Sequence, residues 1–244
     1  MPTKGKSDEN WHGMFLWTTN IGPQHKALLA DIKKTGFDGV EIPVFEGSEA
    51  DFSAIGRMLD ELGLARTAVA ANGDPAQNLI SDNPAERAAG IDHMKWVLDC
   101  CAALGADRVS GPLHSTLGHF SGQGPSQAEL DYSVVSQRQI GTFAAQNGVT
   151  VCLEALNRFE CYLLNTMDAL RAHIHAINHP NIRAMYDTFH ANVEEADPIG
   201  ALTRNKDVVH HIHISENDRG CRAAATFPGP RLLPPSSRSV MKTG

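Results

Sequence analysis

Three side chains that could bind a metal ion follow short apolar runs in the second half of the chain. Glu154, Asp187 and His213 each stand at or near the end of such a run. Apolar runs rich in β-branched residues are typical of strands buried on both faces of a parallel sheet. Because the carboxyl ends of neighbouring parallel strands meet at one edge, the three side chains are expected to converge. Two carboxylates and an imidazole, without a thiolate, suit Mn²⁺, Co²⁺ or Mg²⁺ better than structural zinc.

Each of these residues also has a simpler explanation when it is taken alone. Glu154 could form an ion pair with Arg158 on the surface, and Asp187 could cap the turn that follows it. His213 could be a hydrogen-bonded histidine of the core. The recurrence of such residues on three consecutive strands favours a shared metal site.

Strand and helix patterns alternate seven times along the chain. This alternation predicts a parallel sheet with right-handed crossovers, and eight such units would close a TIM (β/α)8 barrel. The expected strands are 14–17, 39–43, 65–71, 108–110, 149–153, 182–187 and 208–214. The expected helices are 24–34, 51–62, 84–104, 126–146, 166–177 and 198–204. An eighth β/α unit is missing from the pattern or is replaced by an irregular tail.

The composition divides the chain into three parts. Residues 1–10 are polar and are expected to form a disordered lead, and residues 11–220 form the barrel domain. Residues 221–244 carry four of the thirteen prolines and no Asp or Glu, which predicts a Pro-rich, irregular tail. A barrel of seven strands would leave two open edges, which natural proteins usually cover.

The overall charge excludes two classes of partner. A net charge of −7 and a pI of about 5.9 argue against nucleic acid and anionic membranes, which both select clustered Lys and Arg. The chain has no apolar signal region at its start and no apolar run of membrane-spanning length. The five cysteines are odd in number and lack C-x-x-C spacing, which indicates reduced thiols in a cytoplasmic protein.

Several segments together resemble the ketose 3-epimerase family. They are L-E-A-L-N-R-F-E at 153–160, Y-D-T-F-H-A-N-V-E-E at 186–195 and H-I-H-I-S-E-N-D-R-G at 211–220. That family includes the tagatose, psicose (allulose) and L-ribulose 3-epimerases, within the xylose-isomerase-like TIM barrels, and the resemblance covers about residues 12 to 220. It implies a free ketose as substrate, a divalent cofactor with Mn²⁺ first, and a homo-oligomer, either a dimer or a tetramer.

The resemblance also implies a role for each matching residue. Glu154, Asp187 and His213 would be metal ligands. Glu160, His190 and Arg219 would contact O1 to O3 of the ketose, and the first-strand aromatic Phe15 would pack against the sugar.

The implied reaction inverts C3 by removing its proton through a cis-enediolate and returning a proton to the opposite face. A metal would polarise the C2 carbonyl, and one carboxylate is needed on each face. Glu154 matches one of these bases. The family's second base, also its fourth metal ligand, is a Glu of the eighth strand, and this sequence has no Asp or Glu from Cys221 onward. We therefore expect either a frame-shifted ending or a truncation, with impaired catalysis.

Two other functions fit parts of the pattern. An aldose–ketose or hydroxypyruvate-type isomerase on the same barrel would move a proton between C1 and C2. A truncated homologue could bind metal or sugar without efficient catalysis. The expected ketose can be a pentulose or a hexulose.

Overall fold

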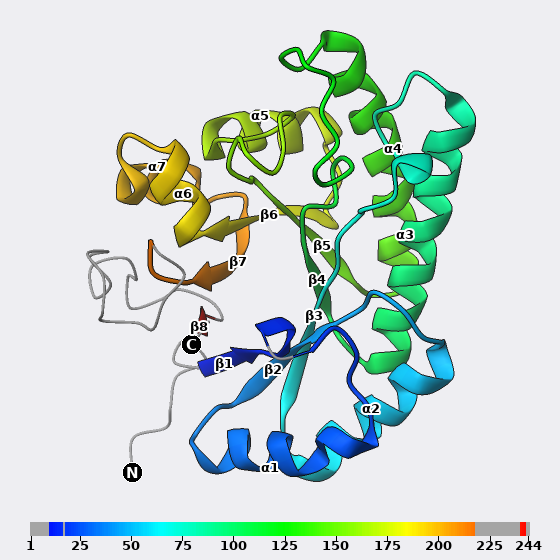
Figure 1. The fold of residues 1–244 in the computed structure, drawn as a ribbon, viewed down its shortest axis with the longest axis vertical. Coiled ribbons are helices and arrows are strands. Elements are labelled where there is room, and N and C mark those ends of the chain that lie inside the picture. The colour runs from blue at the N-terminus through cyan, green and yellow to red at the C-terminus, as the bar shows by residue number, and fades with distance from the viewer. Residues whose placement is uncertain (1–9, 17, 218–239, 243–244) are drawn as a thin grey trace.

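The computed structural model describes residues 10–16, 18–217 and 240–242, and these form a closed barrel of parallel strands (Figure 1). The strands follow one another around the barrel in chain order, and the last pairs with the first. The predicted α/β fold of the TIM-barrel type is therefore confirmed. The strands are β1 Asn10–Gly13, β2 Gly39–Pro43, β3 Ala65–Val69, β4 Arg108–Gly111, β5 Thr150–Glu154, β6 Ile182–Asp187, β7 Val209–Ile214 and β8 Val240–Lys242.

The helices surround the strands (Figure 1), and each α-helix of the described residues after the first begins behind a residue whose side chain caps it. Ser48 and Ser126 each accept a hydrogen bond from a backbone N–H in the first helical turn, and Asn83 does so before the helix that opens with Pro84. The helices are α1 Lys26–Lys34, α2 Glu49–Leu62, α3 Pro84–Leu104, α4 Gln127–Gln146, α5 Met167–Ile177, α6 Thr188–Glu194 and α7 Pro198–Asn205. Short 3₁₀ turns lie at η1 Met14–Leu16, η2 Pro23–His25 and η3 Pro75–Gln77.

The core lies between the strands and the inner faces of the helices. All residues of β2 are buried, and α2 turns Phe52, Ile55 and Leu59 toward the sheet. This is the pattern expected of a parallel barrel, in which helices cover one side of every strand and side chains fill the interior. Among the described residues, no helix is both long and apolar enough to cross a membrane.

The first strand differs from its prediction. The apolar run that begins at Met14 was expected to be a strand, but β1 lies just before it, and Met14–Leu16 forms a 3₁₀ turn. The prediction relied on apolar content, whereas β1 is fixed by its pairing with Gly39–Glu41 of β2. The side chain of Trp11 is buried in β1, and its ring lies where a side chain on Gly39 would otherwise stand. Residue 10 consequently belongs to the barrel, whereas residues 1–9 lie outside the described part of the chain.

The end of the chain also differs from its prediction. Val240–Lys242 forms β8, which pairs in parallel with both β7 and β1, so the two edges expected to be open are joined. The expectation of an irregular segment is wrong for these three residues. Strand pairing uses backbone groups, and a short proline-free segment can supply them without an alternating pattern. Residues 218–239 lie outside the described part.

Gly111 at the end of β4 has a backbone conformation that favours glycine. Its φ is +136°, and an added Cβ would collide with the carbonyl oxygen of Ala70. Gly148 also has positive φ, at +66°, but nothing lies within 4 Å of an added Cβ there. We expect G111A to lower the free energy of unfolding by about 3 kcal/mol, and G148A by about 1 kcal/mol, in urea titrations. Equal losses would show that the Ala70 collision is relieved at little cost.

Candidate active site

Two carboxylates and an imidazole meet at the carboxyl ends of β5 and β6. Glu154 is the last residue of β5, Asp187 is the last of β6, and His190 belongs to α6, which follows directly. One potential ligand atom from each lies within 4.8 Å of the others. His190 Nε2 is 3.5 Å from Oε1 of Glu154, and both side chains are at least nine-tenths buried. The strand ends therefore bring together the kind of donor set that divalent cations select.

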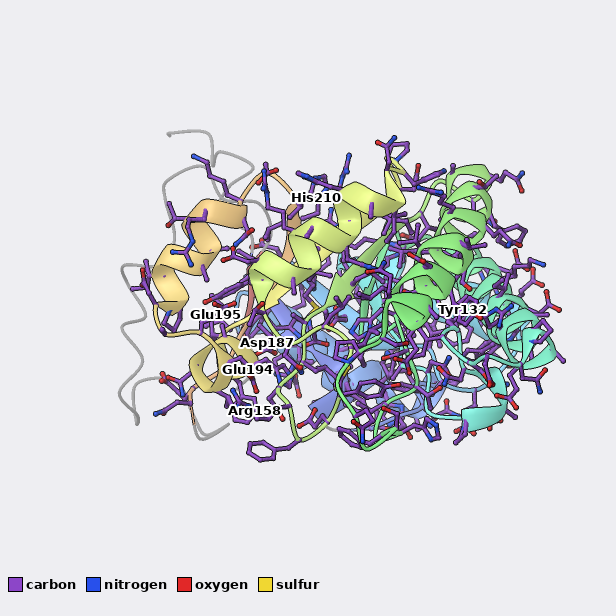
Figure 2. The ribbon with its side chains drawn as sticks, turned by 90° about the horizontal axis from the view of Figure 1, so that it is seen from above. Tyr132, Arg158, Asp187, Glu194, Glu195 and His210 are labelled. Carbon is purple, nitrogen blue, oxygen red and sulfur yellow. The ribbon has the colours of Figure 1, made fainter. Side chains whose placement is uncertain are left out.

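Arg158 does not compete for Glu154. Its guanidinium instead forms an ion pair with Glu194, with Nη2 2.8 Å from Oε2. Figure 2 shows Arg158 at the edge of the molecule in this view, and the side chain of its partner Glu194 is only 3% exposed. The ion pair with Arg158 that was considered for Glu154 is thus made by another carboxylate.

Asp187 uses its two carboxylate oxygens differently. Oδ1 accepts hydrogen bonds from the backbone N–H groups of Phe189 and His190, at 2.7 and 3.4 Å, and so caps α6. Oδ2 lies 3.7 Å from Nδ1 of His213. Burial alone would raise the pKa of the Asp187 carboxyl, but contact with His213, the charges of His190 and His213, and the Phe189 N–H together lower it. The carboxyl is therefore ionised while it caps α6, and its Oδ2 is a potential ligand atom.

His213 faces two carboxylates from opposite sides of its ring. Nε2 is 2.9 Å from Oε2 of Glu41, whereas Nδ1 is the atom near Asp187. Among the described residues, the potential ligand cluster that includes His213 contains Glu41 and His211 and does not contain Glu154. Asp187 thus lies between the other two residues predicted to bind metal. It shares one cluster with Glu154 and His190, and its Oδ2 is near His213.

A bulge in β7 sets the direction of its histidines. The register with β6 pairs Ala184 with Val209 and then Met185 with His211, so His210 is an extra residue. Beyond the bulge, His211 and His213 point to the same side, with ring centroids 5.1 Å apart in a T-shaped arrangement. Bulges of this kind commonly redirect side chains beside active sites.

Asn157 joins two of the residues predicted to contact substrate. Its backbone N–H donates to Nδ1 of His190 at 3.1 Å, and its side-chain amide donates to Oε1 of Glu160 at 3.2 Å. With Nδ1 accepting, the ring proton of a neutral His190 lies on Nε2, the atom that faces Glu154. Phe15 is 51% exposed and packs against Phe45, with ring centroids 5.1 Å apart. The predicted contact Arg219 lies outside the described residues.

Sequence reasoning missed Glu41, Asn157 and the role of His114. The His114 ring lies 3.0 Å from the backbone carbonyl of Glu154, and burial lowers the pKa of the imidazole to about 3, so it is neutral. Glu41 is 2% exposed in the middle of β2. The signal for it was present, since an acidic residue inside the apolar run Gly39–Pro43 needs buried partners. Nothing in the sequence indicated that those partners lie on β4 and β7.

The donor set fits a divalent cation. Glu154 and Asp187 offer carboxylate oxygens, and His213 offers an imidazole nitrogen from the same end of the barrel. The four described cysteines, Cys100, Cys101, Cys152 and Cys161, are free and buried, and none belongs to a potential ligand cluster of the described residues. Oxygen and nitrogen donors without sulfur suit Mn²⁺, Co²⁺ or Mg²⁺.

The chain is similar to several known proteins. Residues 29–236 match the xylose isomerase-like TIM barrel family. The ketose 3-epimerase of Arthrobacter globiformis is 30% identical over 212 residues, which cover 86% of this chain and 72% of that protein. The D-psicose 3-epimerase of Agrobacterium fabrum is 31% identical over 219 residues, which cover 85% and 74% of the two chains. A crystal structure of D-psicose 3-epimerase with D-tagatose from Clostridium cellulolyticum has a TM-score of 0.84 and 25% identity, and covers 96% of this chain and 84% of that chain. The chain therefore belongs to the xylose isomerase-like TIM barrel family and, within it, to the ketose 3-epimerases, which are isomerases.

Proposed function

We propose that this protein is a metal-dependent isomerase that inverts C3 of a free ketose. The observation that carries the proposal is the meeting of Glu154, Asp187, His190 and His213 at the ends of β5, β6 and β7. This arrangement places potential metal ligands beside a carboxylate that can move a proton, in a chain similar to ketose 3-epimerases.

Glu154, Asp187 and His213 would hold the metal, and His213 would bind it through Nδ1. Mn²⁺ is the first candidate, and Co²⁺ and Mg²⁺ are the alternatives. When bound, the metal would act as a Lewis acid toward the C2 carbonyl and stabilise the negative charge that develops on it. Asp187 is suited to be a metal ligand because its capping hydrogen bonds fix one carboxylate oxygen and leave the other facing His213.

Glu154 would remove the C3 proton from one face of the ketose. Its burial shields the carboxylate from water, and the neighbouring N–H of His190 would stabilise an oxygen that gains negative charge. Glu160 would bind a hydroxyl group of the substrate, with Asn157 holding it in place beside His190. Phe15 would pack against the sugar and Arg219 would contact its oxygens. Residues 221–244 contain no Asp or Glu that could serve the opposite face of C3.

The substrate class can be tested directly with purified protein stripped of metal and reloaded with Mn²⁺. Incubation with D-fructose, D-psicose, D-tagatose and L-ribulose, followed by chromatographic separation of products, should reveal the C3 epimer of at least one ketose. Formation of aldoses instead would identify a C1–C2 isomerase. Sugar binding without any product would identify an impaired homologue.

The assembly state can be tested in the same preparation. The similarity to ketose 3-epimerases supports a homo-oligomer, and light scattering should give the mass of a dimer or tetramer of the 26.4 kDa chain. A monomeric mass would contradict this part of the proposal.

A further inference from the structure

Glu41 is a buried acidic residue to which the proposed reaction gives no role. It lies on β2, and its carboxylate reaches residues of β4 and β7. A carboxylate that is 2% exposed is costly to bury unless polar partners compensate for lost water. The polar groups that contact the Glu41 carboxylate therefore indicate why it is kept at this position.

The two oxygens of Glu41 serve different partners. Oε1 accepts a hydrogen bond from Oγ of Ser110 at 2.8 Å and lies 3.1 Å from Nε2 of His211. Oε2 lies 2.9 Å from Nε2 of His213. This last contact is a close ion-pair contact that lacks the angle of a full hydrogen bond. Ser110 and His211 thus fix the carboxylate so that its second oxygen stands against His213.

The contact determines which nitrogen of His213 is available at the strand ends. If Nε2 carries a proton toward Glu41, the lone pair of a neutral ring lies on Nδ1. Nδ1 lies 3.7 Å from Oδ2 of Asp187. Two ligand atoms that are each about 2.0–2.2 Å from one ion are separated by at most roughly 4.4 Å, so this spacing can accommodate a shared ion.

We propose that Glu41 is a positioning residue that, braced by Ser110 and His211, orients His213 and selects the tautomer that offers Nδ1 to the metal. The inference rests on the metal site proposed above. Carboxylates that hold the second nitrogen of a metal-binding histidine typically change metal affinity about 10–100-fold when they are removed. Glu41 would act through His213 without touching substrate or metal.

The first test is the Mn²⁺ affinity of the stripped protein, measured by electron paramagnetic resonance of free Mn²⁺. E41Q is nearly isosteric, but its amide N–H₂ can face Nε2 of His213 and favour the other tautomer. We expect E41Q to weaken Mn²⁺ binding by about 10–100-fold and S110A by several-fold. S133A is the matched control, because Ser133 is a buried serine that contacts a different buried histidine, His173, at 2.9 Å. Its affinity should stay within twofold of the parent.

The second test needs neither metal nor activity. Burial would lower the pKa of the His213 imidazole, but the charge of Glu41 and contact with Asp187 raise it well above its ordinary value. The ¹⁵N chemical shifts of the metal-free protein are therefore recorded at a pH high enough for the ring to lose one proton. The remaining proton should be on Nε2 in the parent and in S133A, and on Nδ1 in E41Q. An unchanged tautomer together with an affinity within twofold of the parent in E41Q would overturn the proposal. If E41Q does not fold, S110A with the same two measurements decides the question, because it loosens the Glu41 carboxylate through a smaller change.

Two further variants separate the possible failures. If H211Q lost as much affinity as D187N, the ion would lie in the Glu41–His211–His213 cluster itself, and the positioning role would be wrong. If D187N bound Mn²⁺ as tightly as the parent, the metal site of the proposed function would be wrong. The tautomer of His213 would still show whether Glu41 orients the ring.

Discussion

Replacing Glu154 with glutamine is expected to lower the rate of C3 proton transfer by about 10²–10⁴-fold, the usual contribution of a positioned general base. The amide cannot accept the proton, although it keeps the shape of the side chain and the nearby His190. In D₂O, the parent should introduce deuterium at C3 of the ketose, and E154Q should not do so at a comparable rate. Nuclear magnetic resonance of the sugar measures both deuterium uptake and inversion in one sample.

E129Q is the control for this experiment. Glu129 accepts a hydrogen bond from Tyr162 and does not belong to the cluster of Glu154, Asp187 and His190. Its exchange rate should stay within about twofold of the parent. If E154Q exchanged deuterium as fast as E129Q, Glu154 would not be the base. The ratio of exchange to inversion in the parent also reports on the second face of C3, since a single base can exchange the proton without inverting the carbon.

Replacing Asp187 with asparagine is expected to weaken Mn²⁺ binding by at least about 100-fold while the fold is kept. Asparagine caps helices as well as aspartate does, so the hydrogen bonds to the start of α6 should remain. The loss can be followed by thermal or urea unfolding with and without Mn²⁺. At a free ion concentration of 100 times the parent's Kd, binding stabilises the parent by about 2.7 kcal/mol and a 100-fold weaker variant by about 0.4 kcal/mol.

D197N provides the matched comparison, because Asp197 caps α7 as Asp187 caps α6. This variant should keep the full stabilisation by Mn²⁺. An equal response of D187N and D197N to the ion would contradict the role of Asp187 as a ligand. Activity is not needed to interpret either result.

The local elements could be predicted from the sequence because local signals define them. β2 and β6 have the predicted limits, and α3 begins at Pro84 after its asparagine cap, as expected. α6 escaped prediction because it is short and its cap, Asp187, was interpreted mainly as a ligand. β1 and β8 were mispredicted or missed because their pairing partners, rather than their own composition, make them strands.

The site could be predicted only in part, for a related reason. The strand-end positions of Glu154, Asp187 and His213 follow from alternation along the chain. Which of their atoms face one another depends on the bulge at His210 and on Glu41, and both are properties of contacts between distant strands. A resemblance to a family can transfer residue roles, but it does not carry these orientations.

The distance along the chain between Glu41 and its partners has a consequence for folding. The contact with His211 joins residues 170 positions apart, and contacts of such separation are costly to form until most of the chain is ordered. The proposed ligands Glu154, Asp187 and His213 all lie in the second half of the barrel, yet the carboxylate behind His213 comes from the first. If Glu41 orients His213 as proposed, a fragment that carries every proposed ligand would lack the oriented imidazole and bind the ion about 10–100-fold more weakly. Full affinity would then appear only when the two halves of the barrel have joined.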